Sequence, residues 1–334
     1  MTSAAPPEAG PDLFWLAPQA AALRQARAQG RLPHALLIQD SPGAGGEQLA
    51  LLAAQTALCT QTDAPCGQCR DCHRVASRSH PDLWFVAPEE DSIQIKIDQI
   101  RVLNGTLTLS GHGSGASVAI LNPADMLTVN SANALLKTLE EPRPGVLIVL
   151  VAAVSARLPA TVLSRCQRLR VQPPLRAEIL AWLRRHRGEG DWEVALDVLG
   201  NAPLRALAAD PAVLRSLRDE TESQLDAALA GSIDLAPAAE RWAQREGLEL
   251  RLLCAENWVT RRILARLARL ARPGSLTELH TGAHLPAGKS SMNIRGLVRL
   301  MDALYELRRL ASTTINKSLA VEQLLWQLRA SGKS

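Results

Sequence analysis

The first half of this chain alternates short strand-like runs with longer helical patterns. The strand candidates span residues 35–38, 83–87, 118–121, 146–152 and 168–171. Helical periodicity separates them, most clearly at residues 99–109 and 131–141. Runs this short are typical of strands, and strands that alternate with helices build a largely parallel sheet. We therefore predict an α/β fold whose sheet carries helices on both faces.

The pair Pro173-Pro174 ends this alternation, because proline disrupts regular hydrogen-bonded structure. Only helical patterns follow, including an apolar face over residues 317–330 that Asn316 can cap. We expect a disordered leader at 1–12, an α/β domain at 13–172, a small helical domain at 173–210 and a larger helical domain at 211–334.

The charge and hydropathy patterns exclude several classes of protein. The formal net charge of the 334 residues is only +4, which does not support a uniformly basic surface. No run approaches the ~18–20 apolar residues that cross a bilayer. The N-terminus lacks the basic start and apolar core of a secretory signal. We therefore expect a cytoplasmic protein without a membrane partner.

Four of the six cysteines crowd into residues 59–72. Their spacing, Cys59-x6-Cys66-x2-Cys69-x2-Cys72, supplies four thiolates, which is the ligand set of a closed structural zinc site. In a cytoplasmic protein this crowding favours metal binding over disulfides. An iron–sulfur cluster and unligated thiols are the alternatives.

A glycine-rich turn follows the first strand candidate and resembles a phosphate loop, G-x-x-x-x-G-K-[ST]. Aligned with that motif, Asp40 stands at the first glycine and Gly45 at the second, with Gly43 between them. Gly46 takes the place of the lysine, and Glu47 takes the place of Ser/Thr. A carboxylate here repels phosphate at the helix start. The turn is a degenerate phosphate loop or a simple turn between strand and helix.

The strand at 118–121 is followed by Asn122-Pro123, where an active nucleotide site has Asp-Glu to hold magnesium and activate water. Neither residue can act as a general base. Asp125 follows shortly after and is expected to start a helix. The lysine, the hydroxyl and the acidic pair are therefore all missing from this candidate magnesium site.

Several longer motifs identify a family. Asn-Pro-Ala-Asp-Met-Leu at 122–127 precedes Asn-Ala-Leu-Leu-Lys-Thr-Leu-Glu-Glu-Pro at 133–142. Leu-Pro-Ala-Thr-Val-Leu-Ser-Arg-Cys follows at 158–166, and Gly-Arg-Leu-Pro-His-Ala-Leu-Leu stands at 30–37. The chain resembles the AAA+ clamp-loader subunits of bacterial DNA polymerase III, specifically over residues 28–172.

The resemblance implies an AAA+ α/β domain with an inserted zinc module, a small helical lid and a C-terminal helical collar through which subunits associate. It implies zinc at the four-cysteine cluster. His73 is the alternative ligand, and we expect both His73 and His80 to lie at the surface.

The resemblance also gives a role to the Ser164-Arg165-Cys166 motif. In the family this arginine reaches the ATP site of the neighbouring subunit, where it stabilises charge on the γ-phosphate. For an isolated residue, a solvated or salt-bridged arginine would be the default interpretation. Cys166 is expected to be a packed thiol, since no base is identifiable beside it.

Active motor subunits (gamma/tau) retain the loop lysine and the acidic pair, which this chain lacks. The resemblance therefore implies a non-hydrolysing clamp-loader subunit, with polymerase activity residing in the holoenzyme. Its implied partners are gamma/tau, the delta subunit, the sliding clamp and primed DNA, at the nucleoid. An active ATPase and an independent zinc-dependent DNA-binding protein are the alternatives.

Two further expectations concern individual side chains. The position that would sense the γ-phosphate falls near Ala152–Ala153, which cannot hydrogen-bond through a side chain, and Arg205 receives no assignment as a second sensor. Trp242, Trp258 and Trp326 are expected to pack internally in the helical region.

Overall fold

The computed structural model describes residues 12–89, 92–109, 115–244, 247–270, 292–311 and 315–331. All but the last residue of the predicted leader at 1–12 lies outside these ranges. The chain divides into two compact units, which are Met1–Ile179 with Ala202–Leu204, and Leu180–Asn201 with Arg205–Ser334. No helix in the described ranges is both long and apolar enough to cross a membrane.

Unit 1 contains the predicted parallel sheet. Its strands are β1 (Ala35–Gln39), β2 (Leu83–Val86), β3 (Ser117–Leu121), β4 (Val146–Ala152) and β5 (Gln167–Arg170). Their order is β2-β3-β4-β1-β5, and all neighbouring strands run parallel. All seven residues of central β4 are buried, whereas edge strand β5 is mostly exposed. The five predicted strands are confirmed within one or two residues at each end.

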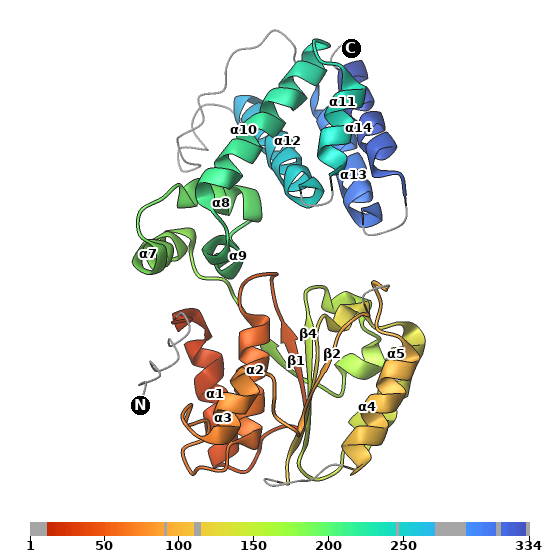
Figure 1. Ribbon diagram of the computed structural model, residues 1–334. Helices are drawn as coiled ribbons and strands as arrows, with labels where there is room; N and C mark the ends of the chain where they lie inside the picture. The colour runs from red at the N-terminus through yellow and green to blue at the C-terminus, as the bar shows by residue number, and fades with distance from the viewer. Residues whose placement is uncertain are drawn as a thin grey trace, which may run out of the picture. The chain divides into compact units, whose positions relative to one another are not determined.

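Helices cover both faces of this sheet, as Figure 1 shows for α1, α2 and α3 on one side and α4 and α5 on the other. The helices of this unit are α1 (Ala17–Ala28), α2 (Gly46–Leu58), α3 (Arg70–Ala76), α4 (Ile97–Leu109), α5 (Val129–Glu140) and α6 (Ala160–Leu163). Short 3-10 helices, Phe14–Leu16, Ala124–Met126 and Ser155–Arg157, link some of these elements. Burial on both faces explains why the central strands read as continuous apolar runs. Helix α3 is too short to produce a periodic sequence signal and was not predicted.

After Pro174, every regular element in the described residues is helical, as predicted. The helices are α7 (Arg176–Arg187), α8 (Trp192–Leu199), α9 (Pro203–Ala208), α10 (Pro211–Ala230), α11 (Leu235–Ala243), α12 (Leu248–Leu270), α13 (Ile294–Leu310) and α14 (Lys317–Ser331). The predicted cap is present, since the Leu319 N–H donates to Asn316 Oδ1 at 3.1 Å. The division of this region into a lid at 173–210 and a collar at 211–334 stays a prediction.

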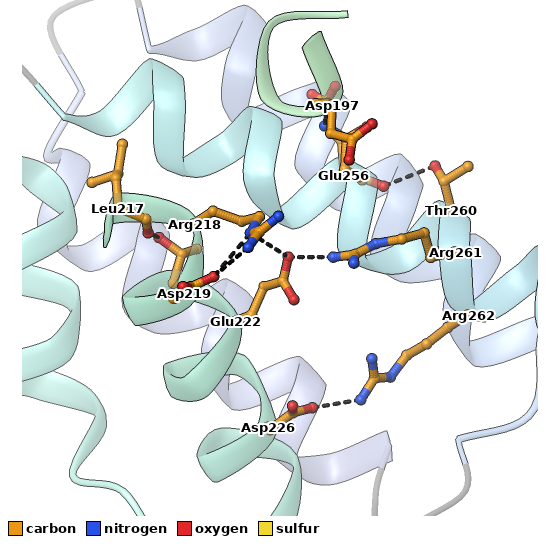
Figure 2. Close-up of polar contacts among 12 residues, drawn as sticks. Asp197, Leu217, Arg218, Asp219, Glu222, Asp226, Glu256, Thr260, Arg261 and Arg262 are labelled. Atoms are coloured by element: carbon orange, nitrogen blue, oxygen red, sulfur yellow. Dashed lines mark hydrogen bonds and ion pairs between the residues drawn. The ribbon is translucent and has the colours of Figure 1, made fainter. Parts of the chain in front are cut away.

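Ion pairs link α10 to α12 in unit 2 (Figure 2). Glu222 pairs with Arg261, and Asp226 pairs with Arg262. The Arg262 guanidinium carbon also lies 3.7 Å from the centroid of the Trp258 ring. Partly exposed pairs such as these each contribute only about 0–1 kcal/mol. Apolar packing between the helices therefore contributes more to the stability of this unit than the ion pairs do.

A buried polar network lies inside the same helical unit. Trp242 Nε1 donates to Gln224 Oε1 at 2.5 Å, and Gln224 Nε2 donates to Glu220 at 2.9 Å. The Arg251 guanidinium bonds Glu220 at 2.8 Å and the Thr221 hydroxyl at 3.2 Å. Because buried polar groups are costly when unpaired, this network fixes how α10, α11 and α12 pack together.

The three tryptophans differ in their environment. Trp242 and Trp258 are almost fully buried, which confirms the expectation of internal packing. The expectation is wrong for Trp326, whose exposed fraction is 62%. On α14 the buried residues are Val321, Leu324, Leu325 and Leu328, and Trp326 lies outside that face.

We predict that Trp242→Phe destabilises the protein by about 1–3 kcal/mol, because it leaves Gln224 Oε1 buried without a donor. The free energy of unfolding, measured by circular dichroism in urea, checks this. Trp326→Phe is the matched control and should have a free energy of unfolding close to that of the wild type. Equal stability of the two variants would contradict the structural role of the network.

Candidate functional site

The turn that resembles a phosphate loop lies between β1 and α2, where the sequence predicted it. Gly43 and Gly45 have φ angles of 83° and 111°, values that residues with a side chain rarely adopt. Gly45 is the N-cap residue of α2. Both glycines are therefore required by the shape of the turn, whether or not an anion binds there.

Asp40 follows β1 directly and folds back into the turn. A Cβ atom on Gly46 would lie only 2.5 Å from Asp40 Cβ and 2.6 Å from Asp40 Oδ2. Position 46 therefore has no room for a lysine side chain while Asp40 holds this conformation. The Asp40 carboxylate lies beside the first backbone N–H of α2, which is where a phosphate loop binds an anion.

The surroundings of Asp40 change its acidity. Burial raises the pKa of its carboxyl to about 6, and a backbone hydrogen bond from Gly46 partly opposes this rise. Among the described residues, Asp40 Oδ1 is buried without a hydrogen-bond partner. The carboxylate form is therefore less stable here than in water.

Glu47, at the Ser/Thr position of the predicted degenerate phosphate loop, and Asn122, at the predicted degenerate magnesium site, hydrogen-bond each other. Asn122 Nδ2 donates to Glu47 Oε2 at 3.2 Å, while Arg78 forms an ion pair with Glu47 Oε1. Glu47 lies in α2, which follows β1, and Asn122 follows β3, whereas β4 lies between β1 and β3 in the sheet. The bond therefore links segments that follow two strands on either side of β4. The Glu47 carboxylate therefore has both an amide and a guanidinium as partners.

Other residues of unit 1 cover the turn. Trp15 Nε1 donates to the Ala44 carbonyl at 2.6 Å, and Leu16 Cδ1 lies 3.2 Å from where a Cβ on Gly45 would stand. The Leu204 N–H donates to the Gly43 carbonyl at 3.0 Å. Sequence reasoning missed these contacts, and it also missed Asp40 as a filler of the turn.

Four further residues that the sequence analysis singled out have the following environments. Ala152 is buried, and its carbonyl accepts from the Asp40 N–H at 3.1 Å. Asp125 belongs to the 3-10 helix Ala124–Met126, and the helix-start expectation is confirmed. Arg205 forms a surface ion pair with Glu249 at 3.2 Å. Pro123 is the N-cap residue of the 3-10 helix.

The Ser164-Arg165-Cys166 motif lies at the end of α6. Arg165 forms an ion pair with Glu140 at 2.7 Å, and the exposed fraction of its side chain is 34%. Cys166 is buried, and this burial raises the pKa of its thiol to about 11. A protonated, packed thiol agrees with the expectation for Cys166.

The four clustered cysteines bring their sulfur atoms together, all within 4.8 Å of one another. Cys59 Sγ lies 3.7 Å from Cys66 Sγ and 3.8 Å from Cys69 Sγ, and the sulfurs of Cys66 and Cys72 are 4.0 Å apart. Each of these cysteines is buried or half-buried. The cluster is a candidate metal centre.

Backbone N–H groups around the cluster point at sulfur. The Cys69 N–H donates to Cys66 Sγ at 3.3 Å, and the Cys72 N–H donates to Cys69 Sγ at 3.4 Å. The backbone N–H groups of Gln68 and Cys69 lower the pKa of the Cys66 thiol to about 7. Burial raises the pKa of Cys59 and of Cys72 instead.

The histidine beside the cluster differs from expectation. His80 was expected at the surface, but only 7% of it is exposed. Its Nε2 atom lies 3.5 Å from Asp71 Oδ1, and its Nδ1 atom accepts from the Asp82 N–H at 3.1 Å. His80 therefore links Asp71 in the cysteine segment to Asp82, which directly precedes β2, and the sequence pattern does not reveal these contacts. His73 is exposed, as expected.

The fold has a counterpart among solved structures. A crystal structure of a DNA polymerase III gamma subunit-related protein from Thermotoga maritima matches with a TM-score of 0.51 and 18% sequence identity. The match covers 94% of this chain and 99% of that one. The match shows that this chain shares its overall fold with that protein.

Sequence comparisons find similar proteins. Residues 17–174 match the family described as "DNA polymerase III, delta subunit". The chain is 38% identical over 196 residues to DNA polymerase III subunit delta' of Haemophilus influenzae, covering 58% of this chain and 60% of that protein. It is 34% identical over 214 residues to subunit delta' of Pseudomonas aeruginosa, covering 63% and 65%.

These matches span less than two thirds of either relative's length. Over the matched region, the chain is similar to the delta' subunits of DNA polymerase III.

We predict that Asp40→Asn stabilises the protein at pH 7.5 relative to the wild type. Because the folded-state pKa of about 6 exceeds the ordinary aspartate value of 3.8, the folded chain binds more protons between these values. Wild-type stability should therefore fall as pH rises from about 4 to 6, and this dependence should weaken in Asp40→Asn.

Urea unfolding midpoints of both proteins at about pH 4 and pH 7.5 measure this difference. Asp63→Asn, at an exposed position of the same unit, is the control. A wild-type-to-variant difference that does not change with pH would contradict the buried environment of Asp40.

Proposed function

We propose that this chain is a non-hydrolysing subunit of the replicative clamp loader, the assembly that uses ATP to place the sliding clamp on primed DNA. One observation carries the proposal. The side chains at the predicted phosphate and magnesium positions contact each other or their own backbone. Asp40 lies against Gly46, and Asn122 bonds Glu47. A nucleotide would have to displace both arrangements, and neither lysine nor an acidic pair would then bind it.

The partners follow from the proposed assembly. They are the gamma/tau ATPase subunits, the delta subunit, the sliding clamp and primed DNA, with the C-terminal helical collar as the region of association. DNA-directed DNA polymerase activity belongs to the holoenzyme, since this chain supplies none of its catalytic carboxylates. In this role the protein works in the cytoplasm, at the nucleoid.

Arg165 is the residue through which the chain acts on a partner's ATP. It follows Ser164 at the end of α6, and part of its guanidinium faces solvent. From this position it reaches into the ATP site of the neighbouring subunit and stabilises the charge that develops on the γ-phosphate. In this role Arg165 contributes one residue to an ATP site whose other residues belong to the neighbouring subunit.

The cysteine cluster fits one structural zinc ion. Zinc–sulfur bonds of about 2.3 Å in a tetrahedron imply sulfur–sulfur distances of about 3.8 Å. The three separations given above, 3.7, 3.8 and 4.0 Å, agree with this value. Cys59, Cys66, Cys69 and Cys72 would fill all four coordination positions, which leaves none for catalysis.

We predict one zinc ion per chain in the purified protein, and Cys69→Ser should lower this content and destabilise the cysteine segment. Elemental analysis by mass spectrometry and the unfolding midpoint check both effects. Cys254→Ser, a buried cysteine outside the cluster, is the control and should keep its zinc. Much less than one zinc per chain, or iron in its place, would overturn this part of the proposal.

We predict that Arg165→Ala lowers ATP turnover by the reconstituted clamp-loader complex without unfolding the subunit. Loss of an arginine finger costs about 10³–10⁵-fold in turnover at the site that it serves, whereas other sites keep theirs. Steady-state ATPase and clamp-loading assays measure the effect. Arg168→Ala, an exposed arginine three residues along, is the matched control and should behave as wild type.

Three results would contradict the proposed function. The isolated chain should neither turn over ATP nor bind DNA tightly in a salt-sensitive way. ATP turnover by the isolated chain favours an active ATPase, and tight DNA binding favours an independent DNA-binding protein. Failure to co-purify with the clamp-loader subunits would remove the main proposal.

A further inference from the structure

Glu140 is the last residue of α5, and its carboxylate reaches a segment 25 residues further along the chain. Arg165 Nη2 lies 2.7 Å from Glu140 Oε1, which is the distance of a charge-assisted hydrogen bond. Both side chains are partly exposed, with exposed fractions of 34% for Arg165 and 49% for Glu140. The pair thus joins the end of α5 to the residues after α6.

The same guanidinium is also held by its own chain. Arg165 Nη1 donates to the Thr161 carbonyl at 2.8 Å and to the Ser164 hydroxyl at 3.2 Å. Both terminal nitrogens of the guanidinium therefore have fixed acceptors. A long arginine side chain that is free in solution samples many rotamers, so these contacts restrict it to one place.

The position of Glu140 is unfavourable for its own helix. Carboxylates at a helix C-terminus interact badly with the negative end of the helix dipole, whereas cations there are favourable. The Arg165 guanidinium supplies the missing cation. Helix stability alone gives no reason for a glutamate here, but its contact with Arg165 does.

We propose that Glu140 is a positioning residue for Arg165, holding the guanidinium in place for the γ-phosphate of a neighbouring subunit's ATP. The inference rests on the proposed role of Arg165 as a trans-acting finger. Arginine has five N–H donors, and the three contacts above use three of them. Two donors stay available to a second anion, so Glu140 orients the side chain without saturating it.

Preorganisation of this kind acts on the catalytic rate. A charged group that is already placed does not lose conformational freedom when the transition state forms. Removal of Glu140 should therefore lower kcat of the complex, while KM for ATP stays the same because the motor subunits bind the nucleotide. Exposed ion pairs add little to stability, so the fold of the subunit should persist.

The test is the ATPase activity of the reconstituted clamp-loader complex that contains Glu140→Ala. We expect kcat at the site served by Arg165 to fall about tenfold with unchanged KM and an unchanged thermal unfolding midpoint. Glu141→Ala is the matched control, because it removes the same charge from the adjacent exposed residue. It should leave kcat unchanged.

A double-mutant cycle with Arg165→Ala shows whether Glu140 acts through the arginine. The double variant Glu140→Ala/Arg165→Ala should be no slower than Arg165→Ala alone. A further loss in the double variant, a normal kcat for Glu140→Ala or a raised kcat would each overturn the positioning role. If Arg165→Ala leaves the ATPase rate unchanged, the proposed arginine finger is wrong. If Arg165→Ala lowers the rate but Glu140→Ala does not, only the positioning role of Glu140 is wrong.

Discussion

The burial of the central strand β4 is the constraint on which the candidate site depends. All seven of its residues are buried, and β1 and β3 pair with it on either side in parallel register. Because all three strands run the same way, the turns that follow β1 and β3 lie at one edge of the sheet. The polar residues of the degenerate nucleotide site meet there, and β4 ends between them in the small residue Ala152.

The side chains at this edge of the sheet form their hydrogen bonds and ion pairs with other groups of the same chain. The Asp40 carboxylate lies at the start of α2, and the Glu47 carboxylate is paired with Asn122 and Arg78. The Asp40 carboxylate places a negative charge where a phosphate loop binds an anion, and the Arg78 guanidinium places a positive charge beside Glu47. The turn between β1 and α2 is therefore closed by side chains of the chain itself.

Much of the fold follows from local sequence patterns. The strands were predicted from short apolar runs, and Asn316 was predicted as a helix cap from its position before α14. The cysteine spacing placed four sulfurs together because residues only a few positions apart cannot lie far from one another. Helix α3 was missed, since its seven residues are too few for a periodic signal, and the exposure of Trp326 was missed because burial depends on neighbouring helices.

The sequence by itself determined the α/β class, the missing lysine and acidic pair, and the four-cysteine set. These properties depend on residue identity and on spacing within single elements, where backbone hydrogen bonding imposes a fixed period. Only the tertiary structure decided that Asp40 fills the turn, that Arg78 pairs with Glu47, and that Glu140 holds Arg165. The pairs Glu47–Arg78 and Glu140–Arg165 join segments far apart in sequence, and they form because packing of the sheet and helices brings the side chains together. Asp40 and Gly46 are close in sequence, but their contact depends on how the turn folds.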